Sequence, residues 1–200
     1  YVNNGIDGNP ISLPINLPFS TYPNATWGAR AILKLPRDFY TMAGIYNGDP
    51  RVGRDEMHGL DFSLRLKRGV FMAHEVGYKP NHEEGAKGLP GNYKLGWFYH
   101  GGTFREYYRD ANGGSSIVTG APLKKHVGNY GFYAHADQML YREKQGSDQG
   151  LTLWSAITWG PDNLNQFPLF VAGGAFYKGL IPCRDNDILA VGTAYGLWSN

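Results

Sequence analysis

Residues 129–141 read NYGFYAHADQMLY, and apolar and polar side chains alternate along them. The two sets are Phe132, Ala134, Ala136 and Leu140 on one side, and Tyr133, His135 and Asp137 on the other. Because successive side chains of a β-strand point to opposite faces, the stretch predicts a strand with one apolar and one polar face. Aromatic residues stand near both of its ends, which is typical of a strand in a membrane barrel.

The same pattern recurs from Trp27 to Ser199, with no helical periodicity between the repeats. About nine runs are expected to be strands, most of them about 9–11 residues long, the length of a tilted transmembrane strand. They are residues 27–36, 39–46, 59–67, 69–79, 92–100, 129–141, 150–160, 168–178 and 188–199. The clearest alternation is GLDFSLRLK, residues 59–67, where Leu60, Phe62, Leu64 and Leu66 oppose Asp61, Ser63, Arg65 and Lys67. We therefore predict an all-β chain that forms an antiparallel up-and-down transmembrane β-barrel.

Composition agrees with this prediction. The 200 residues include 28 Gly, 12 Pro, 14 Tyr, 10 Phe and 5 Trp, which favours strands and tight turns over helices. The net charge of +2 is too small to indicate a nucleic-acid partner. No apolar run reaches the ~18–20 residues of a membrane helix. Cys183 is the single cysteine, which excludes an internal disulfide framework and a thiolate metal site.

The whole chain, residues 1–200, is expected to belong to one barrel domain. Residues 1–24 are rich in Asn, Gly and Pro and predict a loop or extended segment, whereas residues 25–200 hold the strands and loops. The longest connection, residues 101–128, is expected to be an extracellular loop. Strand parity then places four connections at the periplasmic end: residues 47–57, 80–91, 142–149 and 179–187. His74 falls on the apolar face of its run, which indicates either a β-bulge or a wrong register.

Two alternatives remain open from the pattern itself. A soluble β-sandwich or jelly roll also alternates and also contains aromatic strands. The last three strands are apolar or small on both faces, so alternation does not fix their orientation. They indicate either a contact between copies of the chain in a homo-oligomer, or a tight bend at Gly173, Gly174 and Ala175.

Several stretches, in the same order along the chain, resemble the carbohydrate-selective porin (OprB) family of Gram-negative outer membranes. The stretches are STYPNATWGAR from residue 20, MHGLDFSLRLKRGVFMAHEVGYKPN from 57, GLPGNYKLGWFYHGG from 88, GNYGFYAHADQMLYRE from 128, and GLTLWSAITWGPDNLNQFPLFVAGGAFYKGLIPCRDNDILAVGTAYG from 150. The resemblance implies a barrel of about sixteen strands, of which this chain would supply about nine as a fragment. It also implies facilitated diffusion of monosaccharides such as glucose across the bacterial outer membrane.

A sugar channel needs groups that bind hydroxyls on its inner wall. Carboxylates accept hydrogen bonds and Arg or Lys donate them, while an aromatic ring can stack on a sugar face. The expected pore-lining residues are Arg30, Lys34, Asp61, Arg65, Glu75, Lys94, Tyr133, His135 and Asp137. Each charge could instead pair across strands to stiffen the wall. Glu75 and Arg65 are favoured for sugar contact because they fall near mid-strand.

The functional prediction is an outer-membrane channel for glucose-like sugars, and not an enzyme. The expected partners are the sugar and membrane lipid, with no nucleic acid, and neither a cofactor, a metal nor a catalytic residue is expected. His135 and Asp137 share a face and suit a metal or acid–base pair, but no further ligand spacing supports that interpretation. The competing functions are a general diffusion porin and a soluble sugar-binding β-sandwich.

Overall fold

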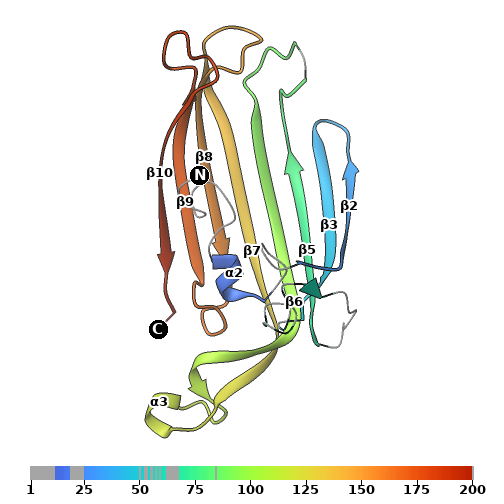
Figure 1. Cartoon of the computed structure of the whole chain (residues 1–200), viewed down its shortest axis with the longest axis vertical. Helices are drawn as coiled ribbons and strands as arrows, with labels where there is room; N and C mark the ends of the chain where they lie inside the picture. The colour runs from blue at the N-terminus through green and yellow to red at the C-terminus, as the bar shows by residue number, and fades with distance from the viewer. Residues whose placement is uncertain are drawn as a thin grey trace.

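A computed structural model describes residues 12–18, 25–49, 51, 54, 56, 58, 60–61, 68–83 and 85–199. Its main feature is one curved antiparallel sheet of eight strands in the order β10-β9-β8-β7-β6-β5-β3-β2 (Figure 1). The strands are β2 Gly28–Lys34, β3 Phe39–Asn47, β5 Val70–Tyr78, β6 Gly91–Asp110, β7 Leu123–Arg142, β8 Gly150–Trp159, β9 Leu169–Lys178 and β10 Ile188–Leu197. Each strand pairs with its neighbour in this order, so the predicted all-β, up-and-down fold is confirmed.

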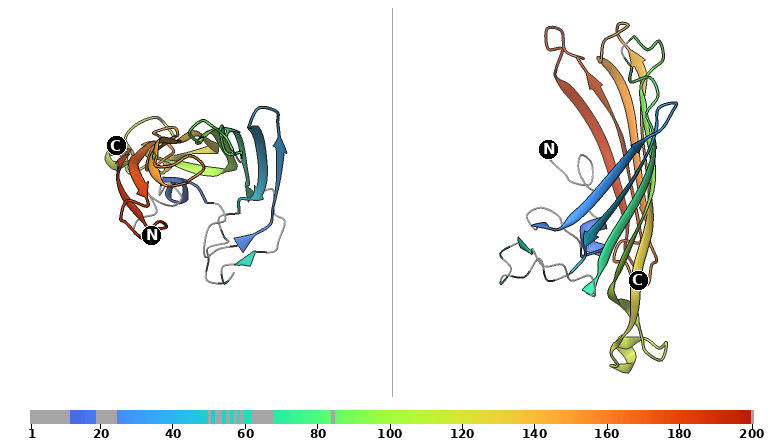
Figure 2. Two further views of the ribbon diagram at one scale, coloured as in Figure 1. Left: turned by 90° about the horizontal axis from the view of Figure 1, so that it is seen from above. Right: turned by 90° about the vertical axis from the view of Figure 1, so that its right-hand side faces the viewer.

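The registers divide the sheet into two chemically different faces. Residues that pair across neighbouring strands point to the same face, as Glu75↔Gly96 and Gly96↔Tyr133 do. Following such pairs across all eight strands assigns each residue to one of the two faces. One face carries every Lys, Arg, Asp and Glu of the regularly paired strands. The other carries mainly apolar, aromatic and small side chains, together with Asn47, His74 and Gln138. The polar face is the concave one, where helix α2 (Ser12–Asn16) lies in the view from above (Figure 2). The registers therefore confirm that each strand has a polar face and an apolar face, as predicted.

Aromatic side chains form two belts on the convex face. At one end Phe39 stacks on Tyr78 with ring centroids 4.5 Å apart, and Tyr78 stacks on Tyr93 at 6.1 Å. At the other end Phe132 stacks on Trp159 at 6.1 Å. About ten residues of strand separate the belts, which spans roughly 25 Å after strand tilt, the height of the apolar band of a membrane barrel. The expected aromatic ends are therefore continuous across neighbouring strands.

His74 lies on the convex apolar face without a bulge, so neither expected explanation for it holds. Strand β5 pairs with β3 and β6 in unbroken register. The His74 Nε2 lies 2.9 Å from Thr41 Oγ1, and its ring lies 6.1 Å from that of Trp97. A cross-strand hydroxyl therefore satisfies the imidazole on this face.

The stretch 59–67 does not lie between β3 and β5, contrary to its place in the predicted strand order. Strand β3 pairs directly with β5 along its whole length, from Phe39↔Tyr78 to Asn47↔Val70. Only Leu60–Asp61 of the stretch is described; it forms β4, which pairs in parallel with β1 (Ala25–Thr26). Residues 62–67 lie outside the described part of the chain. Alternation shows which side chains share a face, but it does not show which strand is the neighbour. The stretch has no place here because β5 already occupies the edge of β3.

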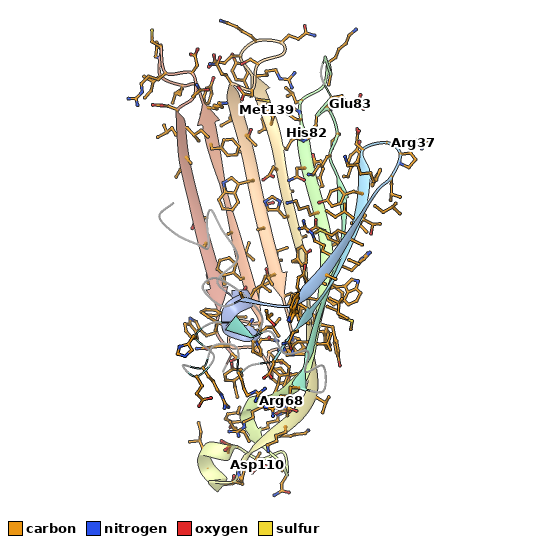
Figure 3. All side chains as sticks on the ribbon, turned by 45° about the vertical axis from the view of Figure 1, so that its right-hand side comes forward. Arg37, Arg68, His82, Glu83, Asp110 and Met139 are labelled. Carbon is orange, nitrogen blue, oxygen red and sulfur yellow. The ribbon has the colours of Figure 1, made fainter. Side chains whose placement is uncertain are left out.

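This pairing corrects one expected loop position. Residues 35–38, 79–83, 85–90, 143–149 and 179–187 gather at one end of the sheet, the turn end. The described ends of the β3–β5 connection, residues 48–49 and 68–69, lie with residues 160–168 and the β6–β7 hairpin at the opposite end, the loop end. Figure 3 shows Arg37 and His82 at the turn end, and Arg68 and Asp110 at the loop end. The expected position of residues 47–57 is therefore wrong for the described part of this connection, because the nine-strand prediction places one strand too many before β5.

The expected long loop 101–128 is largely a continuation of β6 and β7 beyond the rest of the sheet. The two strands pair through Arg105↔Lys125 and Asp110↔Leu123, with register shifts after His100 and after Arg105. A short helix, α3 (Ser116–Thr119), forms the tip. The glycine and charged residues of this stretch predict a loop, but pairing between β6 and β7 extends the two strands into a long hairpin.

Asp110 closes the tip of this hairpin. Its buried carboxylate accepts hydrogen bonds from the Thr119 hydroxyl at 2.7 Å and from the Asn112 and Gly114 amides at 2.8 and 2.9 Å. These bonds, led by that of Thr119, hold the pKa of Asp110 below its ordinary value, although burial acts in the opposite direction. The carboxylate therefore stabilises the tip above the unfolded pKa of about 4, and this contribution is lost as pH falls through the lower folded value.

Asp110→Asn is expected to expose the tip amides at neutral pH. Because the amide side chain removes the charge from these bonds, residues 112–120 should lose hydrogen-exchange protection several-fold. The wild-type protein should approach the variant as the pH falls through the lowered pKa of the folded protein, where the carboxylate becomes protonated. Asp185→Asn, in the turn at the opposite end, is the control. Unchanged protection in Asp110→Asn would contradict the role of this carboxylate.

The amino-terminal segment contains a helix that the sequence analysis did not predict. Asn16 of α2 donates from Nδ2 to the Phe167 carbonyl at 2.7 Å and accepts from the Phe167 amide at 2.9 Å. Neither of the helices that the structure describes is long and apolar enough to cross a membrane. Helix α2 is thus anchored to the loop between β8 and β9, on the concave side (Figure 2).

Strand β9 contains no tight bend at its glycines. The β8–β9 and β9–β10 registers run unbroken through Gly173 and Gly174. The bend interpretation of these small residues is therefore wrong, since both ladders pass through them.

Candidate pore-lining site

The structure brings most of the predicted pore residues to the same concave surface. These residues are Arg30, Lys34, Glu75, Lys94, Tyr133, His135 and Asp137. Asp61 lies in β4, outside the eight-stranded sheet, and its side chain is not described. Arg65 lies outside the described residues. The alternation in the sequence therefore located the polar face correctly for every residue of the set that lies in the sheet.

Glu75 lies at the centre of a three-residue cluster on this wall. Its Oε1 accepts a hydrogen bond from the Tyr40 hydroxyl at 2.6 Å, and its Oε2 accepts one from the Tyr133 hydroxyl at 2.8 Å. The carboxylate is only 7% exposed although it belongs to the polar face. Two tyrosines from strands on either side thus cover Glu75, and both of its oxygens are engaged.

Glycines on the neighbouring strands make this arrangement possible. A Cβ built on Gly77 would lie 2.0 Å from the Tyr40 ring, and one on Gly96 would lie 2.2 Å from the Tyr133 ring. Each tyrosine therefore lies flat across the glycine that it pairs with in the sheet. The missing side chains let both rings lie along the wall and meet Glu75.

Asp137 is also held by wall residues. Asn92 donates from Nδ2 to Asp137 Oδ2 at 3.0 Å across the β6–β7 ladder, and His135 Nε2 lies 3.3 Å from Asp137 Oδ1. Both His135 and Asp137 remain about one-third exposed toward the concave side. Wall pairing and access from the concave side therefore occur together at this position.

The cations of the set are arranged differently from the carboxylates. Within the described ranges, Arg30, Lys34 and Lys94 make no ion pair. Lys34 and Lys94 line one groove of about 760 Å³ together with Glu75 and Tyr40. The Lys79 ammonium lies 5.2 Å from the centre of the Tyr40 ring in the same region. The groove thus combines hydrogen-bond donors with the aromatic surface that covers Glu75.

Sequence reasoning missed three wall residues. Tyr40 and Asn92 share the phase of the predicted polar residues but are not in the expected pore-lining set. Trp154 lies half-buried on the concave face of β8, with Nε1 3.0 Å from the position of a Cβ on Gly174. Tyr40 and Trp154 are each paired with a glycine, which only the registers reveal, so their own strands carry no signal that could have identified them.

At the loop end, segments distant in sequence close over the concave face. Asn129 and Asn165 exchange side-chain hydrogen bonds at 2.9 and 3.2 Å, which fixes the β8–β9 loop against β7. His100 is fully buried and contacts the Pro18 carbonyl through Nε2 at 2.8 Å. The β8–β9 loop and residues 16–18 therefore narrow the space in front of the sheet at this end.

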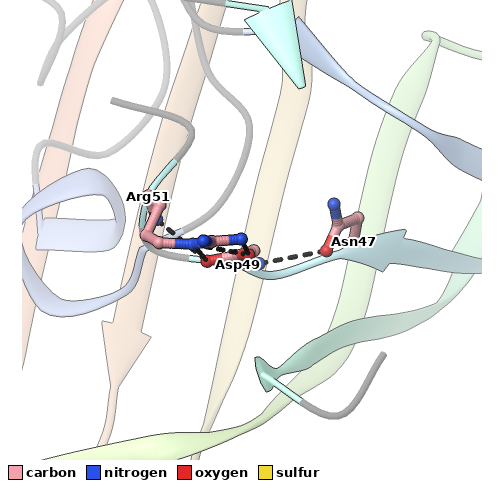
Figure 4. A network of polar contacts seen from close by, with 3 residues as sticks. All are labelled: Asn47, Asp49 and Arg51. Carbon is pink, nitrogen blue, oxygen red and sulfur yellow. Dashed lines mark hydrogen bonds and ion pairs between the residues drawn. The ribbon is translucent and has the colours of Figure 1, made fainter. Parts of the chain in front are cut away.

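The start of the β3–β5 connection is fixed by a charged pair (Figure 4). Arg51 donates from Nε and Nη2 to Asp49, with distances of 3.1 and 2.6 Å, and the Asp49 amide donates to Asn47 Oδ1 at 3.1 Å. The Arg51 hydrogen bonds hold the pKa of Asp49 below its ordinary value, against the opposing effect of burial. Asp49 is therefore engaged by Arg51 at the loop end.

A curved up-and-down sheet with an apolar convex face, aromatic belts and a polar concave face defines the wall of an outer-membrane β-barrel of the porin class. The sequence matches the carbohydrate-selective porin, OprB family over residues 1–200, and the chain belongs to that family. As a member it is a protein of the bacterial outer membrane.

Individual relatives agree with this membership. The chain is 25% identical to Porin B of Pseudomonas aeruginosa over 173 residues, which cover 86% of this chain and 37% of that protein. The high-pH structure of Pseudomonas putida OprB superposes with a TM-score of 0.81 at 25% identity, covering 89% of this chain and 41% of that one. The low-pH structure of the same protein has a TM-score of 0.54 at 19% identity, covering 86% and 40%. The chain thus spans about two-fifths of the length of these relatives.

Proposed function

We propose that the assembled protein is a channel through which neutral monosaccharides such as glucose diffuse down their gradient. The family match supports the sugar as the solute. The observation that carries the proposal is the concave wall, where the exposed Arg30 and Lys34 and the half-buried Lys94 lie beside covered Glu75. In the complete barrel, further strands would pair with the edges of β2 and β10, because unpaired backbone amides are costly in lipid.

The wall chemistry suits weak binding of a neutral sugar. Lysine and arginine donate to hydroxyl oxygens, His135 and Asp137 offer a partly exposed pair, and the rings of Tyr40 and Tyr133 present flat surfaces. A passage site must release its solute, so a dissociation constant near the millimolar range, about −4 kcal/mol, is sufficient. No chemical step is required, and we infer a diffusion channel rather than an enzyme.

Reconstitution of the full-length protein tests this function. In planar bilayers, glucose is expected to reduce the ion current through the channel in a saturable manner, because a bound sugar obstructs the pore. In liposomes, glucose should enter faster than an amino acid of similar size. Equal rates would support the general diffusion porin instead. Absence of any conductance would exclude both kinds of channel.

A further inference from the structure

A separate pocket of about 310 Å³ lies at the loop end, beyond the wall around Glu75. It is enclosed by the extended part of β6, by α2 and by the loop between β8 and β9; its lining includes Asn16, Arg68, His100, Phe104, Glu106 and Leu164. We propose that this pocket is a second sugar-binding site, in which Glu106 Oε2 accepts a hydrogen bond from a hydroxyl of a neutral monosaccharide. The inference rests on the proposed sugar channel and adds a binding site at one entrance.

Glu106 carries the inference because half of its carboxylate is unused. Its Oε1 lies 2.5 Å from His126 Nε2, accepts from Asn163 Nδ2 at 3.3 Å, and lies 3.9 Å from Lys124 Nζ. Its Oε2 is buried and has no hydrogen-bond partner among the residues that the structure describes, and the residue is 3% exposed. Since buried polar atoms in proteins are almost always hydrogen-bonded, this oxygen is available to accept a hydrogen bond from a ligand.

The surroundings keep this carboxylate charged. Burial raises the pKa of Glu106, but the hydrogen bonds from His126 and Asn163, with the nearby His126 and Lys124, hold it below its ordinary value. An ionised carboxylate accepts hydrogen bonds and donates none. It therefore selects a ligand that offers donors, as sugar hydroxyls do, and a carboxylate ligand would meet a like charge.

The rest of the pocket supplies the other groups that a sugar requires. The ring of Phe104 is half-buried and meets the ring of His100 edge-on, at 5.2 Å between centroids. It offers an apolar surface for the C–H groups of a sugar ring. The exposed side chains of Arg68 and Arg105 line the same pocket and can donate to hydroxyl oxygens. The volume is at the lower limit of ligand pockets, which suits a monosaccharide rather than a longer oligosaccharide.

Glu106→Gln in the full-length protein tests the site. Glutamine keeps the shape but replaces one acceptor oxygen by a nitrogen that cannot accept. Single channels in planar bilayers should show that the glucose concentration for half-maximal current reduction, with glucose added at the loop end, rises about tenfold. Glu143→Gln, a matched change in a turn at the opposite end, should behave like the wild-type protein. Heat-modifiable migration on gels verifies that each variant is folded.

Phe104→Leu provides a second test that leaves every charge in place. Loss of the ring face should also weaken the response to glucose at the loop end, and it keeps the inference testable if Glu106→Gln does not fold. Wild-type sensitivity in both variants would overturn the second site and leave the proposed channel intact. A wild-type channel that does not respond to glucose at all would instead refute the proposed function.

Discussion

Replacing Glu75 by alanine is expected to release Tyr40 and Tyr133 from the wall of the barrel. Both hydroxyls would lose their acceptor, and the rings could then rotate away from the glycines beneath them into the channel. Hydrogen bonds to a charged acceptor contribute about 1.5–3 kcal/mol each, and the lower limit applies where water can replace the acceptor. For two bonds at this lower limit, we therefore expect the free energy of unfolding to fall by about 3 kcal/mol, and the single-channel conductance to decrease.

Urea unfolding in lipid vesicles and planar-bilayer recordings of the full-length protein measure these effects. Glu143→Ala is the matched control, because Glu143 accepts from a single tyrosine, Tyr177, in the exposed region of the turn end. That variant should change the free energy of unfolding by less than about 0.5 kcal/mol. Tyr133→Phe combined with Glu75→Ala forms a double-mutant cycle that isolates one of the two bonds. A larger conductance in Glu75→Ala would contradict the placement of the rings against the wall.

Gly174→Ala is expected to have the largest effect on folding. A Cβ at this position would lie 2.2 Å from the Val191 carbonyl oxygen and 2.7 Å from the Gly192 Cα. Both atoms belong to the backbone of β10, so the clash cannot be relieved by rotation of a side chain. Overpacking of this kind costs about 1–3 kcal/mol or more, and we expect the upper part of this range.

Gly173 provides the control on the same strand. It faces the convex side, and a Cβ there would approach the Trp154 carbonyl oxygen at 3.3 Å, a tight but tolerable contact. Gly173→Ala should therefore refold close to wild-type yield, whereas Gly174→Ala should yield markedly less folded protein. Heat-modifiable migration after refolding into detergent measures both. Equal yields would show that the β9–β10 ladder accommodates the added methyl group.

Most of the candidate wall could be predicted because alternation reports directly which face of a strand a side chain occupies. Glu75, Lys94 and Asp137 needed only the correct phase of their own strands, and the registers place them together. The prediction could not tell which charges pair with wall residues. That distinction depends on side chains from other strands, such as Asn92 for Asp137 and Tyr40 for Glu75.

The sequence was less informative where tertiary contacts compete with local pattern. Residues 59–67 show the clearest alternation, yet β3 pairs with β5 and leaves no place between them. Residues 101–128 look like a loop, yet cross-strand pairing extends β6 and β7 through most of them. In both cases the partner strand decides the outcome, and the partner cannot be read from the segment itself.

The sequence by itself determined that the chain forms long amphipathic strands, and which of their side chains are polar, because a period of two residues is fixed by backbone geometry. Only the tertiary structure decided the direct pairing of β3 with β5, the burial of Glu75 beneath two tyrosines, and the lack of a partner for Glu106 Oε2 among the described residues. These features depend on contacts between residues far apart in the chain, such as Glu106 with Asn163 across 57 positions. Such contacts have no periodic trace in the sequence, since they exist only once the sheet has curved.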